Sequence, residues 1–283
     1  MLKSTILLLI LFSSNLYAYH RQIAITIDDL PLVASKMDTP GNQQRSRERF
    51  TKIVEAFSQY KVPVTGFVIA GAIEKGQWEF LEQFRKAGFT LGSHTYSHLN
   101  LNHTSAEKYI ADIEKADKIL APIMSHPKYF RYPYLAEGSN EKKQKVIEYL
   151  NAHDYKIAPV TIDSKDFAFN ESSYKIPYRA RENYIQKVKT RYLAYIWKQT
   201  LRAEKNNKAS KTPQILLIHA NLLNSYLLPD ILDMYKKNGY TFVSLTEALA
   251  PSLSGKSDSA QKILYNRLVT ISADIFSYYA ISF

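Results

Sequence analysis

The chain has 283 residues, of which 46% are hydrophobic and 13% aromatic, so it can bury a full core and is not an intrinsically disordered chain. It contains no cysteine, which excludes disulfide bonds, thiolate metal ligands and cysteine nucleophiles. The formal net charge is +11, and much of it lies between Lys175 and Lys211, where 11 Lys or Arg accompany only two Glu. Such a basic segment can face an acidic polymer, an anionic membrane or nucleic acid.

The first 18 residues have the layout of a secretory signal peptide. Lys3 precedes an apolar run from Ile6 to Phe12, and a polar stretch ends at Ala18. The apolar run is much shorter than the roughly 20 residues that a membrane-spanning helix needs. We therefore expect cleavage after Ala18 and export of the mature chain to the periplasm or the extracellular space, with no transmembrane segment. Export makes nucleic acid the least expected partner.

Along the rest of the chain, short runs rich in β-branched and aromatic residues alternate with segments of helical periodicity. The seven runs are 23–27, 64–69, 89–91, 128–132, 156–162, 214–218 and 240–243. Phe50, Ile53 and Phe57 belong to one apolar stripe with helical spacing. The alternation predicts a parallel α/β protein. Because no glycine-rich phosphate loop follows the first run, a barrel is expected rather than a nucleotide-binding open sheet.

No convincing linker precedes residue 250, so residues 19–250 are expected to form one domain. The last segment, 251–283, begins with a loop-like composition and is expected to be a tail of unknown role. Within the basic segment, Ile185, Val188, Tyr192 and Ile196 keep helical spacing, which predicts a helix with one face packed on the barrel. Its basic face is either an ordinary solvated surface or a surface that attracts an acidic polymer or an anionic membrane.

Potential ligands, acids and bases gather where five of the seven expected strands end. Active sites of parallel α/β folds form at the carboxyl ends of the strands. The segments at these ends are Asp28–Asp29, His94, Arg131–Tyr134, Asp163–Asp166 and His219. Chance would scatter such residues over the surface, so the pattern predicts an enzyme.

Each of these residues also has an ordinary structural interpretation. Adjacent carboxylates such as Asp28 and Asp29 often cap a turn or a helix. His219 could be a hydrogen-bonded core histidine, and Arg131 could be a salt-bridge partner. On an extended strand, Asp28 and Asp29 start from opposite faces, so they can have different roles.

His94 and His98 are four residues apart, the spacing that brings two imidazoles to one metal ion on a helical turn. Surface helices produce this spacing by accident, but its position directly after a strand favours a site. Two histidines and one aspartate form a metal site with open positions for water and substrate. A divalent cation there polarises a carbonyl group and lowers the pKa of bound water, while a second carboxylate serves as base and a histidine as acid.

Between residues 26 and 219, these motifs resemble, in order, the five motifs of the polysaccharide deacetylases, the NodB-like family also known as carbohydrate esterase family 4. Thr26–Asp29 resembles the first motif, which implies Asp28 as the general base and Asp29 as a metal ligand. His94–His98 resembles the second motif and implies that both histidines are metal ligands. Arg131–Tyr134 resembles the third. The resemblance implies that Arg131 positions the base and that a backbone amide near Tyr134 helps to hold the oxyanion.

The last two motifs supply the acid and part of the substrate pocket. Asp163–Phe167 resembles the fourth motif, in which Asp166 would tune the catalytic histidine. Leu217–His219 resembles the fifth, which implies His219 as the general acid and Leu217 as a wall of the acetyl pocket. Two positions depart from the family pattern. Ile27 replaces a more common aromatic residue, and Phe167 stands where tryptophan is usual, which can alter the sugar-facing wall.

The resemblance implies a distorted (β/α) barrel of about seven parallel strands and one divalent metal ion, usually zinc, for which cobalt or nickel can substitute. The expected function is an exported metal-dependent hydrolase that removes N-acetyl groups from the amino sugars of a glycan. The glycan could be peptidoglycan, a chitin oligomer or poly-N-acetylglucosamine, and it could be anionic.

Two alternatives stay open. One is a related metal-dependent amidase that acts on a non-acetyl or a non-sugar amide. The other is a catalytically dead glycan-binding wall protein. The sequence opposes the second alternative, because a decayed enzyme should have lost at least one of Asp28, Asp29, His94, His98 and His219.

Overall fold

The computed structural model describes residues 21–32, 37–74, 76–206 and 212–250. The expected signal peptide (1–18) and the expected tail (251–283) lie outside the described residues. Among the described helices, none combines the length and the apolar composition that crossing a bilayer requires.

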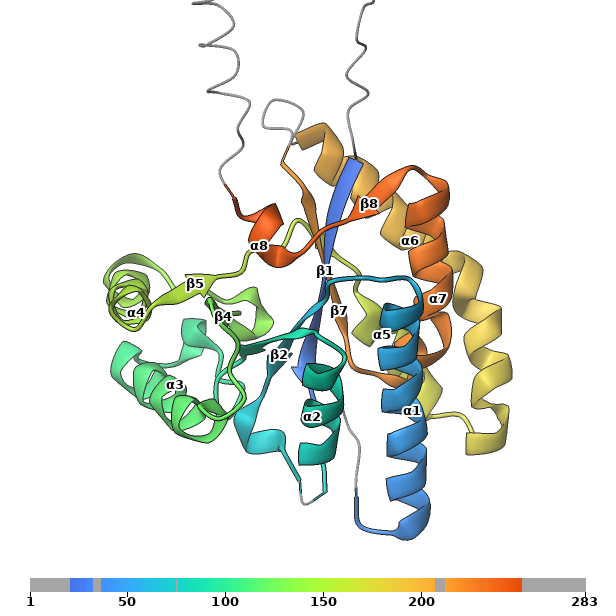
Figure 1. The fold of residues 1–283 in the computed structure, drawn as a ribbon, viewed down its shortest axis with the longest axis horizontal. Helices are drawn as coiled ribbons and strands as arrows, with labels where there is room; N and C mark the ends of the chain where they lie inside the picture. The colour runs from blue at the N-terminus through green and yellow to red at the C-terminus, as the bar shows by residue number, and fades with distance from the viewer. Residues whose placement is uncertain (1–20, 33–36, 75, 207–211, 251–283) are drawn as a thin grey trace, which may run out of the picture.

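A parallel sheet forms the centre of the protein, with helices packed around it (Figure 1). The strands are β1 (Arg21–Leu30), β2 (Thr65–Val68), β3 (Thr90–Ser93), β4 (Lys128–Phe130), β5 (Tyr155–Ile157), β6 (Ile162–Asp163), β7 (Gln214–His219) and β8 (Tyr240–Phe242). Their order is β5-β4-β3-β2-β1-β7-β6, and β8 pairs with the first residues of β1. Among the described residues no ladder joins β5 to β6, so the sheet curls into an incomplete barrel. The predicted distorted barrel of about seven parallel strands is confirmed.

The strand prediction was wrong in one place, because the run 156–162 forms two strands rather than one. β5 pairs with β4 and β6 pairs with β7, so the chain between them crosses from one edge of the sheet to the other. Pro159 lies in this crossing and has no N–H group to donate to a ladder. Its carbonyl oxygen instead accepts a hydrogen bond from Arg131 Nη2 at 3.4 Å, which ties the crossing to the barrel interior.

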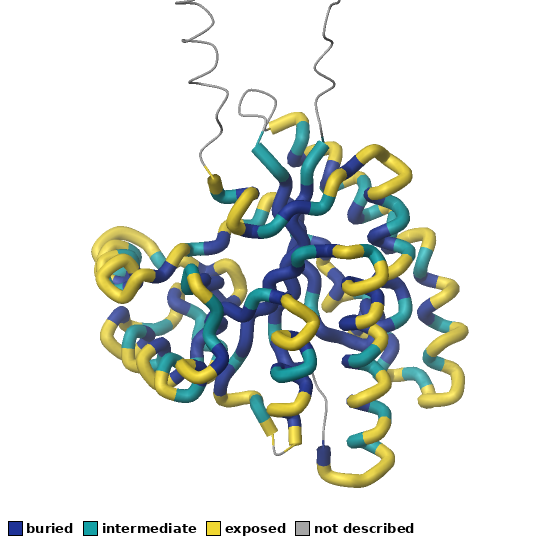
Figure 2. Tube along the Cα trace, in the orientation of Figure 1, coloured by how far each residue is buried: buried dark blue, intermediate teal, exposed yellow. Residues whose placement is uncertain are grey.

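Helices cover the outside of the sheet, and their apolar faces meet it. The helices are α1 (Pro40–Gln59), α2 (Trp78–Lys86), α3 (Ala106–Leu120), α4 (Asn140–Ala152), α5 (Asp166–Tyr174), α6 (Arg181–Asn206), α7 (Leu222–Lys237) and α8 (Leu245–Ala248). The short 3₁₀ turns are η1 (Ala70–Ala72), η2 (Leu101–His103), η3 (Pro133–Leu135) and η4 (Tyr178–Ala180). The predicted stripe with Phe50, Ile53 and Phe57 is fully buried in α1. Figure 2 shows the buried residues along the central strands and the exposed ones on the outer helix faces.

The pairing register brings distant residues to one rim of the barrel. Asp28 on β1 is the Cα partner of His219 on β7, and Thr26 is the partner of Leu217. Residues paired in a parallel register point to the same face of a sheet, so these four side chains share one face. β3 pairs with β4 at Ser93 and Phe130, one residue before His94 and Arg131 respectively. The carboxyl ends of β1, β3, β4 and β7 therefore meet, as the sequence predicted.

Candidate active site

A cleft of about 600 Å³ opens at the carboxyl ends of the strands. Eight of the ten predicted site residues line it: Asp28, Asp29, His94, His98, Tyr134, Phe167, Leu217 and His219. The other two, Arg131 and Asp166, lie behind this lining with 1% and 0% of their surface exposed. Each of them is hydrogen-bonded to a lining residue, Arg131 to Asp28 and Asp166 to His219.

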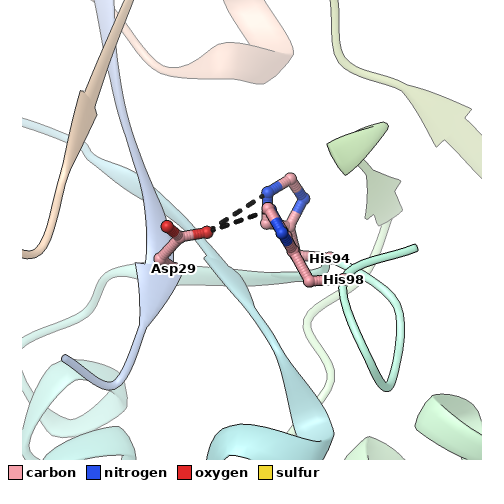
Figure 3. Close-up of side chains that lie close together, drawn as sticks. All are labelled: Asp29, His94 and His98. Carbon is pink, nitrogen blue, oxygen red and sulfur yellow. Dashed lines mark ion pairs between the residues drawn. The ribbon is translucent and has the colours of Figure 1, made fainter. Parts of the chain in front are cut away.

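Asp29, His94 and His98, which line the cleft, point toward one another (Figure 3). Asp29 Oδ1 lies 3.5 Å from His94 Nε2 and 3.4 Å from His98 Nε2. The expectation that Asp28 and Asp29 use opposite faces was wrong, because both line this cleft. The β1–β2 register is interrupted between Ile27 and Leu30, and Asp29 has a φ of 60°. This bulge rotates Asp29 toward the histidines.

The segment from His94 to His98 is a loop and not a helical turn, so the predicted reason for the convergence of the two histidines was wrong. Thr95 and His98 have φ values of 66° and 56°, and such left-handed residues bend the chain sharply. Asp112 on α3 holds the bend, because its Oδ2 accepts hydrogen bonds from the amides of Tyr96 (3.0 Å) and Ser97 (2.9 Å). The Thr95 hydroxyl accepts a further bond from the His98 amide at 3.0 Å.

The two histidines are neutral and present ring nitrogens to Asp29. Burial lowers the pKa of His94 to about 3, and burial with the neighbouring His94 lowers the pKa of His98 to about 3. His94 Nδ1 lies 2.8 Å from the Arg131 carbonyl oxygen, to which it donates, so Nε2 carries the lone pair. Burial raises the pKa of Asp29 to about 6, which leaves this carboxyl largely ionised at neutral pH.

This arrangement fits a divalent cation. Asp29 Oδ1 is buried and has no hydrogen-bond partner among the described residues, although the ring nitrogens face it. A carboxylate oxygen and lone-pair nitrogens repel one another unless positive charge lies between them. Ligand atoms on one tetrahedral ion with bonds of about 2.1 Å are separated by about 3.4 Å, close to the separations from Asp29 Oδ1 to the two ring nitrogens. The three residues thus form a possible His/Asp metal site.

Asp28 lies beside this site and is held from behind by Arg131. The Arg131 Nη1 group lies 3.4 Å from Asp28 Oδ2, and its Nη2 donates to Thr26 Oγ1 at 3.1 Å. The guanidinium also stacks over the Phe67 ring at 4.7 Å. Burial raises the pKa of Asp28, while the charge of Arg131 opposes that rise. Asp28 Oδ1 is buried without a hydrogen-bond partner among the described residues, so a basic oxygen is available at the cleft.

His219, the β7 partner of Asp28, also lines the cleft and is bonded to Asp166. The separation between His219 Nδ1 and Asp166 Oδ1 is 2.6 Å, and the His219 amide donates to Asp166 Oδ2 at 2.7 Å. Burial lowers the pKa of His219, but the charge and hydrogen bond of Asp166 outweigh burial and raise it to about 10. His219 is therefore a protonated imidazolium whose Nδ1–H is occupied. Its Nε2–H remains to donate a proton.

The predicted substrate-binding residues form the walls of the cleft. Tyr134 and Phe167 are 65% and 53% exposed, which is unusual for aromatic side chains and suits stacking against a ligand. Tyr134 has a φ of 58° within η3, and its ring centre lies 4.5 Å from that of His98. Phe167 meets His219 edge to face at 6.2 Å. Leu217 completes an apolar wall next to His219.

Sequence reasoning missed the residues that support these groups from other parts of the chain. Asn221 Nδ2 donates to Asp166 Oδ2 at 2.9 Å, and Asn224 Nδ2 donates to the same oxygen and to the His219 carbonyl. Asn221 is also the N-cap of α7, a role that its position two residues after a strand could have suggested. Its bond to Asp166 has no local signal, because 55 residues separate the two.

Comparisons with known proteins identify the family. The polysaccharide deacetylase family model matches residues 18–158, which contain the first three motifs. A chitin deacetylase of Arthroderma benhamiae is 33% identical over 91 residues, covering 31% of this chain and 23% of that protein. A peptidoglycan-N-acetylglucosamine deacetylase of Bacillus cereus is 25% identical over 147 residues, covering 52% of this chain and 46% of that protein. The chain thus spans less than half the length of these curated relatives.

Solved structures show the same fold. The pseudoenzyme BA3943 from Bacillus anthracis, assigned to carbohydrate esterase family 4, superposes with a TM-score of 0.56 at 17% sequence identity, covering 82% of this chain and 66% of that chain. A fold shared with a pseudoenzyme does not establish activity, because activity depends on the side chains in the cleft. From the family model, the curated relatives and the fold, the chain belongs to the polysaccharide deacetylase family.

Proposed function

We propose that this chain is a metal-dependent hydrolase that removes N-acetyl groups from the amino sugars of a glycan. One observation carries the proposal. A neutral histidine pair and a carboxylate oxygen without a hydrogen-bond partner among the described residues converge in a cleft that a second, buried carboxylate and a protonated histidine also line. Amide hydrolysis needs a base that activates water and an acid that protonates the leaving nitrogen, and Asp28 and His219 can fill these two roles. The named activities of the curated relatives support the same reaction.

Asp29, His94 and His98 would hold the cation, and zinc is the first candidate, although cobalt or nickel suit the same N/O ligand set. When bound, the cation acts as a Lewis acid that polarises the acetyl carbonyl and lowers the pKa of a bound water. Other residues of the chain hold the metal ligands in position. The Arg131 carbonyl fixes the His94 tautomer, and Asp112 fixes the loop that carries His98.

The proton transfers are assigned to Asp28 and His219. Asp28 accepts a proton from the attacking water, and Arg131 holds the carboxylate through Asp28 Oδ2. The water oxygen forms a bond to the carbonyl carbon, and the bond from that carbon to the sugar nitrogen then breaks. His219 Nε2 donates its proton to the departing nitrogen. The products are acetate and an amino sugar with a free amine.

The cleft walls position the substrate for this reaction. Negative charge develops on the acetyl oxygen, and we assign the Tyr134 amide to stabilise it. The next two amides in the chain are already used, because those of Leu135 and Ala136 donate to the carbonyls of Tyr132 and Pro133 at 3.0 Å each. Leu217 would contact the acetyl methyl group. Tyr134 and Phe167 would stack against sugar rings.

Acetate release from a substrate panel tests the proposal. We expect the metal-loaded protein to release acetate, with an equal amount of new free amine, from N-acetylglucosamine oligomers or from peptidoglycan glycan. Chelation should stop the release, and restoring zinc should restore it. Release of a product other than acetate would identify an amidase of different specificity. Glycan binding without any release would identify a dead glycan-binding protein, and either result would reject the proposal.

We also propose that the chain is exported through its first 18 residues. The charged start, the short apolar run and Ala18 support this proposal. N-terminal sequencing of the protein purified from its host tests it. A mature chain that begins near Tyr19 and is recovered outside the cytoplasm is the expected result. An intact Met1 in the cytoplasmic fraction would contradict it.

A further inference from the structure

A second, small pocket lies between α1, η4 and α7, where α1 packs beside α7 (Figure 1). Its lining is strongly basic and consists of Arg45, Glu48, Arg49, Lys52, Tyr178, Leu222, Ser225 and Tyr226. Its volume of about 20 Å³ leaves room for one small group. The pocket is separate from the cleft and contains none of the residues assigned to the reaction.

Arg49 lines this pocket, and two of its three guanidinium nitrogens lack an acceptor within the described part of the chain. Its Nε and Nη1 atoms are buried and lack a hydrogen-bond partner among the described residues. A guanidinium carries five N–H donors and stays charged, so burying it without an acceptor costs free energy. Burial lowers the pKa of Arg49 accordingly. Glu48 lines the pocket, but within the described part of the chain it forms no ion pair with Arg45, Arg49 or Lys52.

Further cations surround Arg49, and each of them lies over a tyrosine ring. Arg45 lies 5.1 Å from the centre of the Tyr178 ring, and Lys52 Nζ lies 4.2 Å from the centre of the Tyr226 ring. Arg181 lies 5.7 Å from the Tyr178 ring centre. These ring contacts fix the direction of the cations but supply no full negative charge.

The acidic residues near this cluster do not balance it. Among the described residues, Glu48 lines the pocket and Glu182 directly follows Arg181 in the chain. Four cations against these two carboxylates leave two positive charges. The cluster therefore attracts an anion.

Tyr174 connects the pocket to the active-site cleft. Its side chain lines the cleft, and its ring centre lies 5.6 Å from the Arg181 guanidinium carbon. The same guanidinium lies 5.7 Å from the centre of the Tyr178 ring, and Tyr178 lines the basic pocket, so Arg181 contacts residues of both the cleft and the pocket. The Tyr174 hydroxyl is itself buried without a hydrogen-bond partner among the described residues. Two sets of unused donors thus meet at the wall between the cleft and the basic pocket.

We propose, on the basis of the deacetylase function proposed above, that the pocket of Arg45, Arg49 and Lys52 binds a carboxylate carried by the glycan whose N-acetyl group occupies the cleft. One oxygen of the carboxylate would accept a charge-assisted hydrogen bond from a buried N–H group of Arg49 that lacks an acceptor among the described residues. The second oxygen of the carboxylate could accept from the Tyr174 hydroxyl. The substrate class is then an acidic N-acetylated glycan rather than a neutral one.

Kinetics on two matched substrates test this assignment. Acetate release is measured on a neutral N-acetylglucosamine oligomer and on an oligomer of equal length whose sugars carry carboxylates. For Arg49→Gln we expect KM on the acidic oligomer to rise about tenfold, the loss expected for one charge-assisted bond, with kcat unchanged. KM on the neutral oligomer should not change. Arg47→Gln is the matched control, because Arg47 lies on the same helix but pairs with Glu79 at 2.8 Å.

Additional measurements keep the proposal testable if Arg49→Gln fails to fold. Lys52 is exposed, so Lys52→Gln should fold and should raise KM on the acidic oligomer by a smaller factor. Inorganic phosphate, used as a free anion, should compete with the acidic oligomer and not with the neutral one. Calorimetric binding of the acidic oligomer to wild type and to Arg49→Gln tests the pocket without any turnover.

The outcomes separate this proposal from the proposed function. If wild type releases no acetate from either oligomer but binds the acidic one through Arg49, the proposed deacetylase function is rejected and the proposed carboxylate-binding pocket is supported. If the two oligomers have equal KM values in wild type and in both variants, the pocket proposal is overturned. Phosphate protection against thermal unfolding without any preference for the acidic oligomer would show a site for free anions only, which also overturns it.

Discussion

His94 and His219 line the same cleft, and both side chains are largely removed from water. Nδ1 of His94 is bonded to the Arg131 carbonyl at 2.8 Å, whereas Nδ1 of His219 is bonded to the Asp166 carboxylate at 2.6 Å. The pKa of His94 falls to about 3 because of burial, and that of His219 rises to about 10 because Asp166 outweighs burial. A neutral acceptor orients an imidazole without offsetting the cost of a buried charge, but a carboxylate offsets that cost.

This difference separates the two roles that the proposed reaction requires. A neutral imidazole with a free Nε2 lone pair can bind a cation, and a protonated imidazole can donate a proton. A cation bound at Asp29, His94 and His98 adds positive charge in the cleft and lowers the pKa of His219 from its metal-free value. Such a shift moves the acid toward the neutral range, where general acids are most effective.

The largest expected effect is the loss of the metal-binding side. His94→Ala or Asp29→Ala should remove the bound metal and reduce acetate release on the order of 10³-fold, because several kcal/mol of carbonyl polarisation are lost. Metal content after dialysis and turnover are measured on the same preparation. His103→Ala is the control, since His103 is exposed and lies outside the cleft. A His94→Ala protein that keeps a full equivalent of metal would reject this ligand set.

A smaller effect is expected on the acid side of the cleft. A general acid works in its protonated form, so the rate should fall as pH rises through the pKa of His219. His219→Ala should reduce the rate about 10²-fold, should flatten this alkaline limb and should leave the metal bound. Asp166→Asn should move the limb to lower pH, because it removes the charge that raises the pKa of His219.

Asp163→Asn provides the control for Asp166→Asn. Asp163 also lines the cleft, but its carboxylate pairs with Lys165 at 2.7 Å rather than with His219. If the alkaline limb of the pH–rate profile is unchanged in both Asp166→Asn and His219→Ala, His219 is a structural core histidine and not the general acid.

The stability of the metal-free protein should show opposite pH dependences for the two kinds of histidine. The folded-state pKa of His219 lies above its unfolded value of 6.5, so its contribution is fully present below pH 6.5 and is lost as pH rises toward 10. The folded-state pKa of His98 lies near 3, below that value, so stability is lost as pH falls from 6.5 toward 3.

The free energy of unfolding, measured with denaturant at pH 3.5, 6 and 9.5, separates these two contributions. Each pH lies about one-half unit from one of the three pKa values: the folded-state pKa of His98, the unfolded-state pKa, or the folded-state pKa of His219. His219→Gln should reduce the loss of stability between pH 6 and 9.5. His98→Asn should reduce the loss between pH 6 and 3.5. If the free energies of unfolding of both variants depend on pH as that of wild type does, the assignment of a protonated His219 and a neutral His98 is wrong.

The smallest expected effect concerns exposed charges on α6. The predicted stripe of Ile185, Val188, Tyr192 and Ile196 is buried, so the opposite face of this helix meets solvent. Lys187, Arg191 and Lys198 are exposed, whereas Lys189 forms an ion pair with Asp230. Exposed charges are screened within roughly 8 Å at physiological ionic strength, unlike the buried groups of the cleft.

Activity on an anionic polymer should therefore fall as salt rises, while activity on a neutral chitin oligomer should hardly change. Replacing Lys187, Arg191 and Lys198 by Gln should remove that difference. The same salt response for both substrates, before and after the substitutions, would show that this face is only solvated surface.

Much of the fold and of the site follows from patterns that are local in the sequence. The strand runs, the helical stripes and the clustering of Asp28, His94 and His219 at strand ends need only periodicity and the geometry of parallel sheets. The split of the run 156–162 could have been suspected from Pro159, which has no N–H group to donate.

The remaining features depend on contacts between distant residues. The left-handed φ of Asp29 turns its carboxylate toward the histidines, although a non-glycine residue gives no sequence sign of that conformation. Asp112 orders the histidine loop from α3, and Asn224 supports Asp166 across 58 residues. Asp and Asn at these positions resemble ordinary helix residues until the chain is folded.

The most direct test of the proposed division of roles is a paired measurement on Asp28→Asn. Asp28 is not one of the three converging ligands, so the variant should retain a full equivalent of metal. Without its base it should release acetate from an N-acetylglucosamine oligomer at least about 10²-fold more slowly than wild type. Metal content and acetate release must come from the same preparation. A variant that turns over at the wild-type rate, or one that has lost its metal, would contradict the assignment of Asp28 as the base beside a separate metal site.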